Sequence, residues 1–214
     1  MLELEARAEP SRLMAWASPL LAVALMLVGG LAVFAALGKD PVEGFRVFFL
    51  NPVKDLYALS ELLLKATPLM LCAIGLAIGF RANVWNIGAE GQFMLGAVAA
   101  TGVALYFGDA ESALVLPAMV LAGAAGGAAW AAIPALLRTR FNANEILVSL
   151  MLVYVAQLFV SWLVFGPWKD PDGFNFPQTR MFAEAATLPM VIEGTRLHFG
   201  FAIALAALVA GYAF

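Results

Sequence analysis

The stretch Phe80–Phe93, with the sequence FRANVWNIGAEGQF, places an Arg, a Glu, two Asn and a Gln between two long apolar runs. The apolar runs predict membrane-spanning helices. An ionised side chain at the centre of such a helix costs about 3 kcal/mol on insertion scales, so polar groups at that depth need a protein partner or a water-filled path. The polar stretch is therefore the first candidate for a transport element.

The composition of the chain excludes a soluble globular domain. Hydrophobic residues make up 63% of the sequence and charged residues 13%, whereas soluble domains carry about 25% charged residues. The mean hydropathy is +0.90. Helices and closed barrels are the two structures that satisfy backbone polar groups in hydrocarbon, and the sequence lacks the short alternating segments of a barrel. It predicts an all-α, polytopic helix bundle in a membrane.

Six hydrophobic segments form a single transmembrane domain over residues 1–214, since a spanning helix needs about 20 apolar residues. The expected spans are residues 13–38, 56–80, 88–108, 112–137, 146–168 and 197–214. Residues 39–55 and 169–196 are interpreted as external loops. The last segment reaches the end of the sequence without a polar flank, so we expect the N-terminal part of a longer chain.

Positive charges in short loops predict the orientation. Arg7 and Arg12 precede the first span and Arg138 and Arg140 follow the fourth, whereas the short loop 109–111 carries only acids. Because Lys and Arg favour cytoplasmic loops, the N-terminus is expected in the cytoplasm.

Motifs of soluble enzymes do not occur in the sequence. There is no phosphate-binding loop, and the single cysteine, Cys72, excludes an internal disulfide. His198 is also the only histidine. The glycine-rich patch Gly123–Gly127 is interpreted as a site of close helix packing, as are Gly75 and Gly79 four residues apart.

The polar stretch has two interpretations that spacing alone leaves open. It is either an ordinary loop or a discontinuous element, in which Gly88 and Gly91 let the backbone unwind and the following helix offers its free N–H groups. The candidate pathway or gate residues within it are Asn83, Asn86, Glu90 and Gln92.

A second polar feature lies on the fifth span, where Tyr154, Gln157 and Ser161 share one helical face. Such a stripe favours contact with protein or water over lipid. Hydrogen bonding between helices and direct contact with a substrate are both consistent with it, and Tyr154 and Gln157 join the candidate pathway residues.

Several motifs together resemble the permease subunits of bacterial ABC importers for nucleosides and simple sugars, within the wider ribose and branched-chain amino acid permease superfamily. They occur in family order from about residue 55 onward and are LKATPL at 64–69, GFRANVWNIGAEGQ at 79–92, RFNANEI at 140–146, LML at 150–152, PQT at 177–179 and GTRLH at 194–198. The resemblance implies a short cytoplasmic turn that includes Arg138, Arg140, Asn144 and Glu145.

The resemblance implies a multi-pass permease subunit of the bacterial plasma membrane that takes up nucleosides or related simple sugars by alternating access. It implies no enzymatic activity and no cofactor or metal in this chain, because separate cytoplasmic subunits bind and hydrolyse ATP. The other expected partners are a second permease subunit, in a homo- or heterodimer, an external solute-binding lipoprotein and membrane lipid, with no nucleic acid. The family's later coupling segment, with its Ala-rich Gly-Ile motif, does not occur in this sequence.

Alternative functions stay open at this point. A permease for ribose or branched-chain amino acids would share the architecture. A secondary transporter coupled to protons or sodium would need a buried carboxylate relay, for which Glu90 is the strongest candidate and Glu61 a weaker one. A membrane scaffold without transport activity is disfavoured by the polar stretch.

Overall fold

The computed structural model describes residues 11–108 and 110–213, and within these ranges the chain is helical, with one isolated β-bridge and no β-strand. The all-α prediction is confirmed. Contacts divide the chain into two compact units, residues 1–62 and 63–214, which are described separately. By length and composition, four of the described helices could cross a membrane: α1, α3, α5 and α6.

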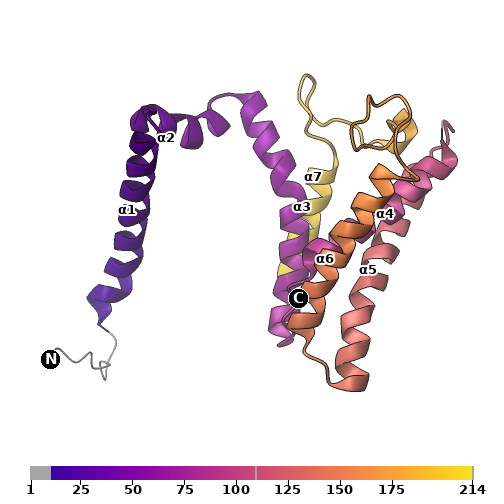
Figure 1. Cartoon of the computed structure of the whole chain (residues 1–214), viewed down its shortest axis with the longest axis horizontal. Helices are drawn as coiled ribbons and strands as arrows, with labels where there is room; N and C mark the ends of the chain where they lie inside the picture. Colours follow the sequence, from indigo (N-terminus) through magenta and orange to yellow (C-terminus); the bar gives the residue numbers. More distant parts are fainter. Residues whose placement is uncertain (1–10, 109, 214) are drawn as a thin grey trace. The chain divides into compact units, whose positions relative to one another are not determined.

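The first unit holds α1 (Arg12–Ala36) and α2 (Pro41–Phe49), followed by the short 3₁₀ helix η1 (Asn51–Val53). Residues 39–55, interpreted as an external loop, contain helical segments that were not expected, because α2 has its own start signal. Asp40 Oδ1 accepts the N–H groups of Val42 at 2.8 Å and Glu43 at 3.2 Å, and Pro41 occupies the first helical position. Figure 1 shows α2 next to the C-terminal end of α1.

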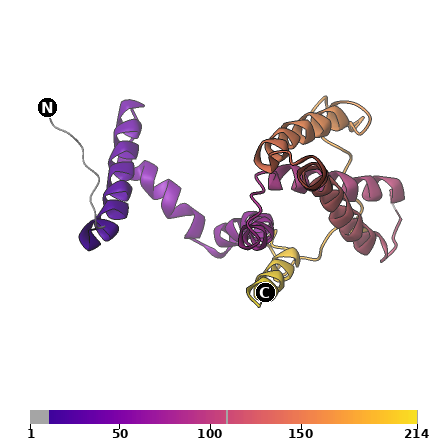
Figure 2. The ribbon, with the colours of Figure 1, turned by 90° about the horizontal axis from the view of Figure 1, so that it is seen from below.

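The second unit contains the remaining helices. α3 (Leu56–Arg81) begins in the first unit and continues into the second, where α4 (Ala89–Phe107), α5 (Val115–Phe141), α6 (Glu145–Phe165) and α7 (Gly200–Tyr212) follow. Helices α4, α5 and α6 pack together, while α7 lies beside α3 (Figures 1 and 2). The α3–α7 contact is close, since a Cβ on Gly211 would lie 2.8 Å from Ile74 Cγ2.

Glycine and alanine bring α4 and α5 together, which confirms the packing interpretation of Gly123–Gly127. A Cβ on Gly96 would lie 2.9 Å from the carbonyl oxygen of Gly123, and one on Gly126 would lie 2.6 Å from Ala99 Cβ. Small residues let helix backbones approach closely where lipid gives no hydrophobic driving force. The same expectation is wrong for Gly75, since no described atom outside its own helix lies within 4 Å of a Cβ there.

Several helix boundaries differ from the predicted spans. α5 continues to Phe141, so Arg138 and Arg140 lie in its last turn, where cations interact favourably with the helix dipole, and not in the loop after it. The 88–108 segment forms α4, which is long enough to span but less apolar because it begins with Glu90 and Gln92, and α7 has only 13 residues; neither is among the four candidate spans. α7 begins at Gly200 and not at residue 197, because residues 197–199 belong to a hairpin.

The segment between α6 and α7 is ordered by its own hydrogen bonds. It contains the short 3₁₀ helix η2 (Glu184–Ala186) and a hairpin at residues 189–199, closed by bonds from Val191 N–H to Leu197 O at 2.8 Å and from Phe199 N–H to Pro189 O at 2.9 Å. Arg180 Nη2 donates to the carbonyl oxygen of Leu105 at 2.8 Å. This bond fixes the segment to the C-terminal end of α4.

Candidate functional site

Asn83 ends α3 in a Schellman motif. Its φ of 57° is left-handed, a conformation that Gly and Asn tolerate best. The N–H of Val84 bonds to Gly79 O at 2.9 Å, and the N–H of Asn83 bonds to Phe80 O at 3.0 Å. The structure therefore gives Asn83 a capping contact, beside its place in the wall of a cavity described below.

Asn86 and Gln92 pair through their side-chain amides across the start of α4. Asn86 Nδ2 donates to Gln92 Oε1 at 3.1 Å, and Gln92 Nε2 donates to Asn86 Oδ1 at 3.3 Å. Asn86 Oδ1 also accepts the N–H of Gly88 at 2.9 Å. Two predicted site residues are thus brought together, and both are partly buried.

The connector between α3 and α4 is fixed to α6. Ile87 N–H donates to Ser149 Oγ at 3.3 Å, and a Cβ on Gly88 would lie 2.9 Å from Ser149 Cβ. In the first turn of α4, a Cβ on Gly91 would lie 3.1 Å from Val153 Cα. The expectation that the backbone is unwound at both glycines is wrong for Gly91, which is helical, whereas Gly88 is the N-cap that follows the non-helical connector. Both glycines permit close approach to α6.

Glu90 and Gln157 connect α4 and α6 through a hydrogen bond of 3.3 Å from Gln157 Nε2 to Glu90 Oε1. Glu90 is nevertheless classed as exposed within this chain. Tyr154, from the same predicted stripe, is 61% exposed and does not join this contact. The residues of α6 that pack inside the chain lie on another face: Ser149, Val153, Ala156 and Leu163.

The turn between α5 and α6 covers only residues 142–144. Asn142 takes a left-handed φ of 50°, and Asn144 Oδ1 caps α6 by accepting the N–H groups of Ile146 at 3.0 Å and Leu147 at 3.2 Å. An ion pair joins the two helices across this turn, with Arg138 Nε 3.4 Å from Glu145 Oε2. Glu145 is the first residue of α6, and Arg140 is exposed.

A cavity of about 420 Å³ brings together half of the predicted site residues, with members from both sets. We call it the turn-side cavity. The connector and α4 contribute Asn83, Asn86 and Gln92, and the α5–α6 corner contributes Arg138 and Glu145, with the remaining wall formed by Val84, Trp85, Ala131, Pro134, Ala135, Thr139 and Ser149. Glu90, Arg140, Asn144, Tyr154 and Gln157 are not among its lining residues.

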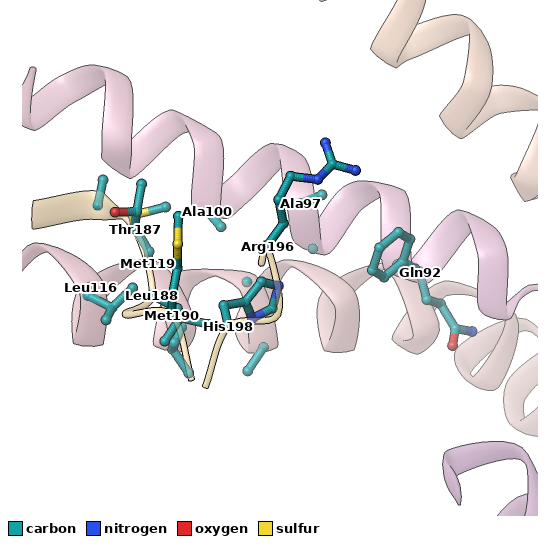
Figure 3. Close-up of a pocket in the computed structure, with 16 residues that line it drawn as sticks. Gln92, Ala97, Ala100, Leu116, Met119, Thr187, Leu188, Met190, Arg196 and His198 are labelled. Carbon is teal, nitrogen blue, oxygen red and sulfur yellow. The ribbon is translucent and has the colours of Figure 1, made fainter. Parts of the chain in front are cut away.

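A second cavity, of about 620 Å³, lies between α4, α5 and the segment 186–198. We call it the hairpin-side cavity. Its walls are mainly small or apolar, and Figure 3 shows Met119, Met190, Arg196 and His198 around it. His198 Nδ1 accepts the N–H of Gly200 at 3.1 Å, which orients its ring. Apart from Gln92, none of its lining residues is among the predicted site residues.

Gln92 is common to the walls of both cavities. Two sets of α5 residues line the cavities. The hairpin-side cavity is lined by residues 116, 119, 120, 123 and 124, and the turn-side cavity by residues 131, 134, 135, 138 and 139. Their spacing of three and four residues places them along one helix face. Gly127 lies between the two sets, and a Cβ there would be 3.2 Å from the carbonyl oxygen of Gln92. α4 and α5 thus touch where one cavity ends and the other begins.

Sequence reasoning missed the parts of the site that depend on contact between helices. Ser149 is only 2% exposed and anchors the connector, and its one sequence signal is a hydroxyl inside an apolar run. Trp130 lines neither cavity but lies at the contact between α5 and the start of α4. Within the described residues its Nε1 is buried without a hydrogen-bond partner, 3.3 Å from the position of a Cβ on Gly91.

Comparison with known proteins finds relatives along nearly the whole chain. Glucose ABC transporter permease protein TsgB13 of Haloferax volcanii is 41% identical over 222 residues, covering 99% of this chain and 58% of that protein. Guanosine ABC transporter permease protein NupP of Bacillus subtilis is 29% identical, covering 89% and 55%. A second Bacillus subtilis protein, guanosine ABC transporter permease protein NupQ, is 34% identical over 107 residues, covering 49% and 34%.

The chain spans a little more than half the length of the first two of these relatives. No solved structure matches it. Residues 58–214, the greater part of the chain, match the family described as branched-chain amino acid transport system / permease component. This multi-pass membrane chain therefore belongs to the family of branched-chain amino acid transport system permease components.

Proposed function

We propose that this chain is part of the permease subunit of an ATP-driven ABC importer that takes up nucleosides or related simple sugars by alternating access. Family membership and the names of the relatives, which are glucose and guanosine ABC transporter permeases, support this function. The proposed location is the bacterial plasma membrane. We place the N-terminus in the cytoplasm and the hairpin at 189–199 outside, as the Arg residues at the ends of the expected spans predict.

The observation that carries the proposal is the pair of cavities along one face of α5, which meet at Gln92. A substrate path needs space toward both sides of the membrane and a closure between them. The proposed path follows the α5 face from the hairpin-side cavity to the turn-side cavity. The closure is at Gln92, whose amide is held by Asn86 through bonds of 3.1 and 3.3 Å.

The proposed closure opens when α4 and α6 move relative to α5. The Glu90–Gln157 bond connects α4 to α6, and the Ile87–Ser149 bond connects the preceding connector to α6. The Arg138–Glu145 ion pair spans the α5–α6 corner at the turn-side cavity. A force applied at that corner would therefore reach both the connector and the start of α4. Such a change between two packed states is the basis of alternating access.

Energy for this movement is proposed to come from separate ATP-binding subunits in the cytoplasm, so that the chain itself is not an enzyme and binds no cofactor. Bacillus subtilis has two proteins named guanosine ABC transporter permease, NupP and NupQ, which favours a second permease subunit as partner. An external solute-binding lipoprotein is the third proposed partner. Uptake by the full-length system should require ATP, and uptake driven by a proton or sodium gradient alone would contradict this function.

Paired cysteine variants test the path directly. Ala124 lines the hairpin-side cavity and its neighbour Ala125 does not, while Ala131 lines the turn-side cavity and its neighbour Ala132 does not. Each is changed to Cys in the full-length protein with Cys72→Ser, and uptake is measured after treatment with a membrane-impermeant thiol reagent. Loss of uptake is expected for Ala124→Cys treated from outside. For Ala131→Cys, loss of transport is expected after treatment of the cytoplasmic face in inverted vesicles, where transport is measured as release of substrate from the vesicle lumen.

The neighbours Ala125→Cys and Ala132→Cys are the matched controls, because residue type, helix and depth are nearly the same. Substrate added before the reagent should protect Ala124→Cys. Equal sensitivity of the lining and control positions would place the path elsewhere in the protein. Competition between labelled guanosine and glucose in the same vesicles would separate the two substrate classes.

A further inference from the structure

The helix α2 is amphipathic and has no part in the proposed transport path. At 100° per residue, Val42, Phe45, Phe48 and Phe49 lie within one arc of the helix, whereas Glu43 lies on the opposite side beside Val47 and Arg46 lies at the edge of the apolar arc next to Val42. Arg46 Nη1 and Glu43 Oε2 form an ion pair of 3.2 Å on the polar side. A helix with this division is suited to a boundary between an apolar and an aqueous medium.

α1 contacts the side of α2 that carries Gly44 and Phe45, and so covers only part of the apolar face. The Phe45 ring lies against α1, 2.9 Å from the position of a Cβ on Gly30, and forms an edge contact with Phe34 at a centroid distance of 6.0 Å. On either side of this contact, Val42 is 74% exposed and Phe48 is 70% exposed.

The contact between Phe45 and Gly30 indicates how deep the apolar face of α2 would lie, measured along α1 from its C-terminal end. Gly30 lies six residues before the end of α1 at Ala36, which corresponds to about 9 Å along the helix axis. Amphipathic helices in the membrane interface bury their apolar face by about 5–10 Å. α1 is itself a candidate membrane span, none of whose hydrophobic window is buried inside the chain.

We propose that α2 is an interfacial anchor, which lies in the plane of the membrane with Val42, Phe48 and Phe49 in the boundary between lipid headgroups and acyl chains. The occupant of this face is lipid, because the face is continuous with the apolar surface of α1. Glu43 and Arg46 face water. Lys39 and Lys54 lie just outside the two ends of the α2–η1 segment, and Lys54 Nζ lies 3.8 Å from Asp55 Oδ2.

Depth measurements on spin-labelled protein test this placement without any transport assay. The full-length protein with Cys72→Ser is labelled at Phe48→Cys, Val42→Cys, Glu43→Cys or Arg46→Cys in vesicles of phosphatidylethanolamine and phosphatidylglycerol. Collisions with oxygen, which concentrates in the bilayer, are compared with collisions with a water-soluble nickel chelate. Leu25→Cys, in the middle of α1, is the standard for the bilayer interior.

The labels at Phe48 and Val42 are expected to collide more with oxygen than with the nickel chelate, and to lie at a depth between the Leu25 label and water. The labels at Glu43 and Arg46 are expected to collide more with the nickel chelate than with oxygen. Phe49→Cys provides a third position on the apolar face if either variant fails to assemble. Equal access of the chelate to both faces would mean a solvated segment and would overturn the proposal. Shielding of the apolar-face labels from both reagents would mean a protein partner on that face, which would also overturn it.

Discussion

The amide pair of Asn86 and Gln92 gives the most specific prediction. Asn86 takes part in three hydrogen bonds, two with Gln92 and one with the N–H of Gly88. Both bonds recorded for the Gln92 amide are the ones it shares with Asn86. Asn86→Ala therefore removes three bonds, and Gln92→Ala removes two of the same three.

The expected magnitudes follow from these counts. A hydrogen bond contributes a net stability of about 0.5–1.5 kcal/mol, so Gln92→Ala should cost about 1–3 kcal/mol and Asn86→Ala about 1.5–4.5 kcal/mol. The double variant loses the two shared bonds only once. Its cost should fall short of the sum of the single costs by a coupling free energy of about 1–3 kcal/mol.

The assay is chemical unfolding of the full-length protein in detergent micelles, together with uptake normalised to the amount of protein in the membrane. If the pair forms the proposed closure, a change of about 1–3 kcal/mol would shift the balance of two access states by about fivefold to somewhat above a hundredfold. Both single variants should then lose uptake while their abundance in the membrane stays close to wild type.

Thr139→Ala is the matched control, because Thr139 lines the same cavity and its hydroxyl bonds only to carbonyl oxygens of its own helix. When Thr139→Ala is combined with Asn86→Ala, the losses in free energy of unfolding should add. If the losses in free energy of unfolding caused by Asn86→Ala and Gln92→Ala add within about 0.5 kcal/mol in the double variant, the pairing is refuted. Normal uptake by both single variants would refute the closure.

Three further predictions concern packing, capping and charge. Gly126→Ala should destabilise the protein by about 1–3 kcal/mol in detergent unfolding, because its Cβ would lie 2.6 Å from another side chain. Gly75→Ala should be neutral or stabilising, because no described atom outside its helix lies within 4 Å of a Cβ there. Equal effects of the two variants on stability would contradict the α4–α5 contact. Asn83→Val should lower the unfolding midpoint more than Asn83→Gly, since φ is 57° there, and the reverse order would contradict the Schellman motif. Arg138→Glu should reduce uptake but cost less than about 1 kcal/mol of stability, because about half of the Arg138 side chain is exposed. Adding Glu145→Arg to the same protein should restore uptake. If uptake is not restored, the ion pair is not the relevant contact.

The class of fold could be read from the sequence because the membrane imposes it. Long apolar runs must become helices in hydrocarbon, where every backbone polar group needs an internal partner. The glycine patch in α5 could also be interpreted correctly. The helix α2 was missed since its nine residues include Glu43 and Arg46, although Asp40 and Pro41 are a recognisable start signal. The end of α5 was placed too early, because Arg138 and Arg140 are equally suited to a loop and to a last helical turn.

The arrangement of the site was decided by tertiary structure. The sequence indicated Asn86 and Gln92 as polar residues near a membrane span, but not that their amides pair with each other across the start of α4. The bond between Ile87 and Ser149 joins residues 62 positions apart, and Gly91 meets Val153 on another helix. Helical periodicity specifies which residues share a face of one helix. Which faces meet depends on how closely small residues let two backbones approach, and that close packing sets the boundary between the two cavities at Gln92.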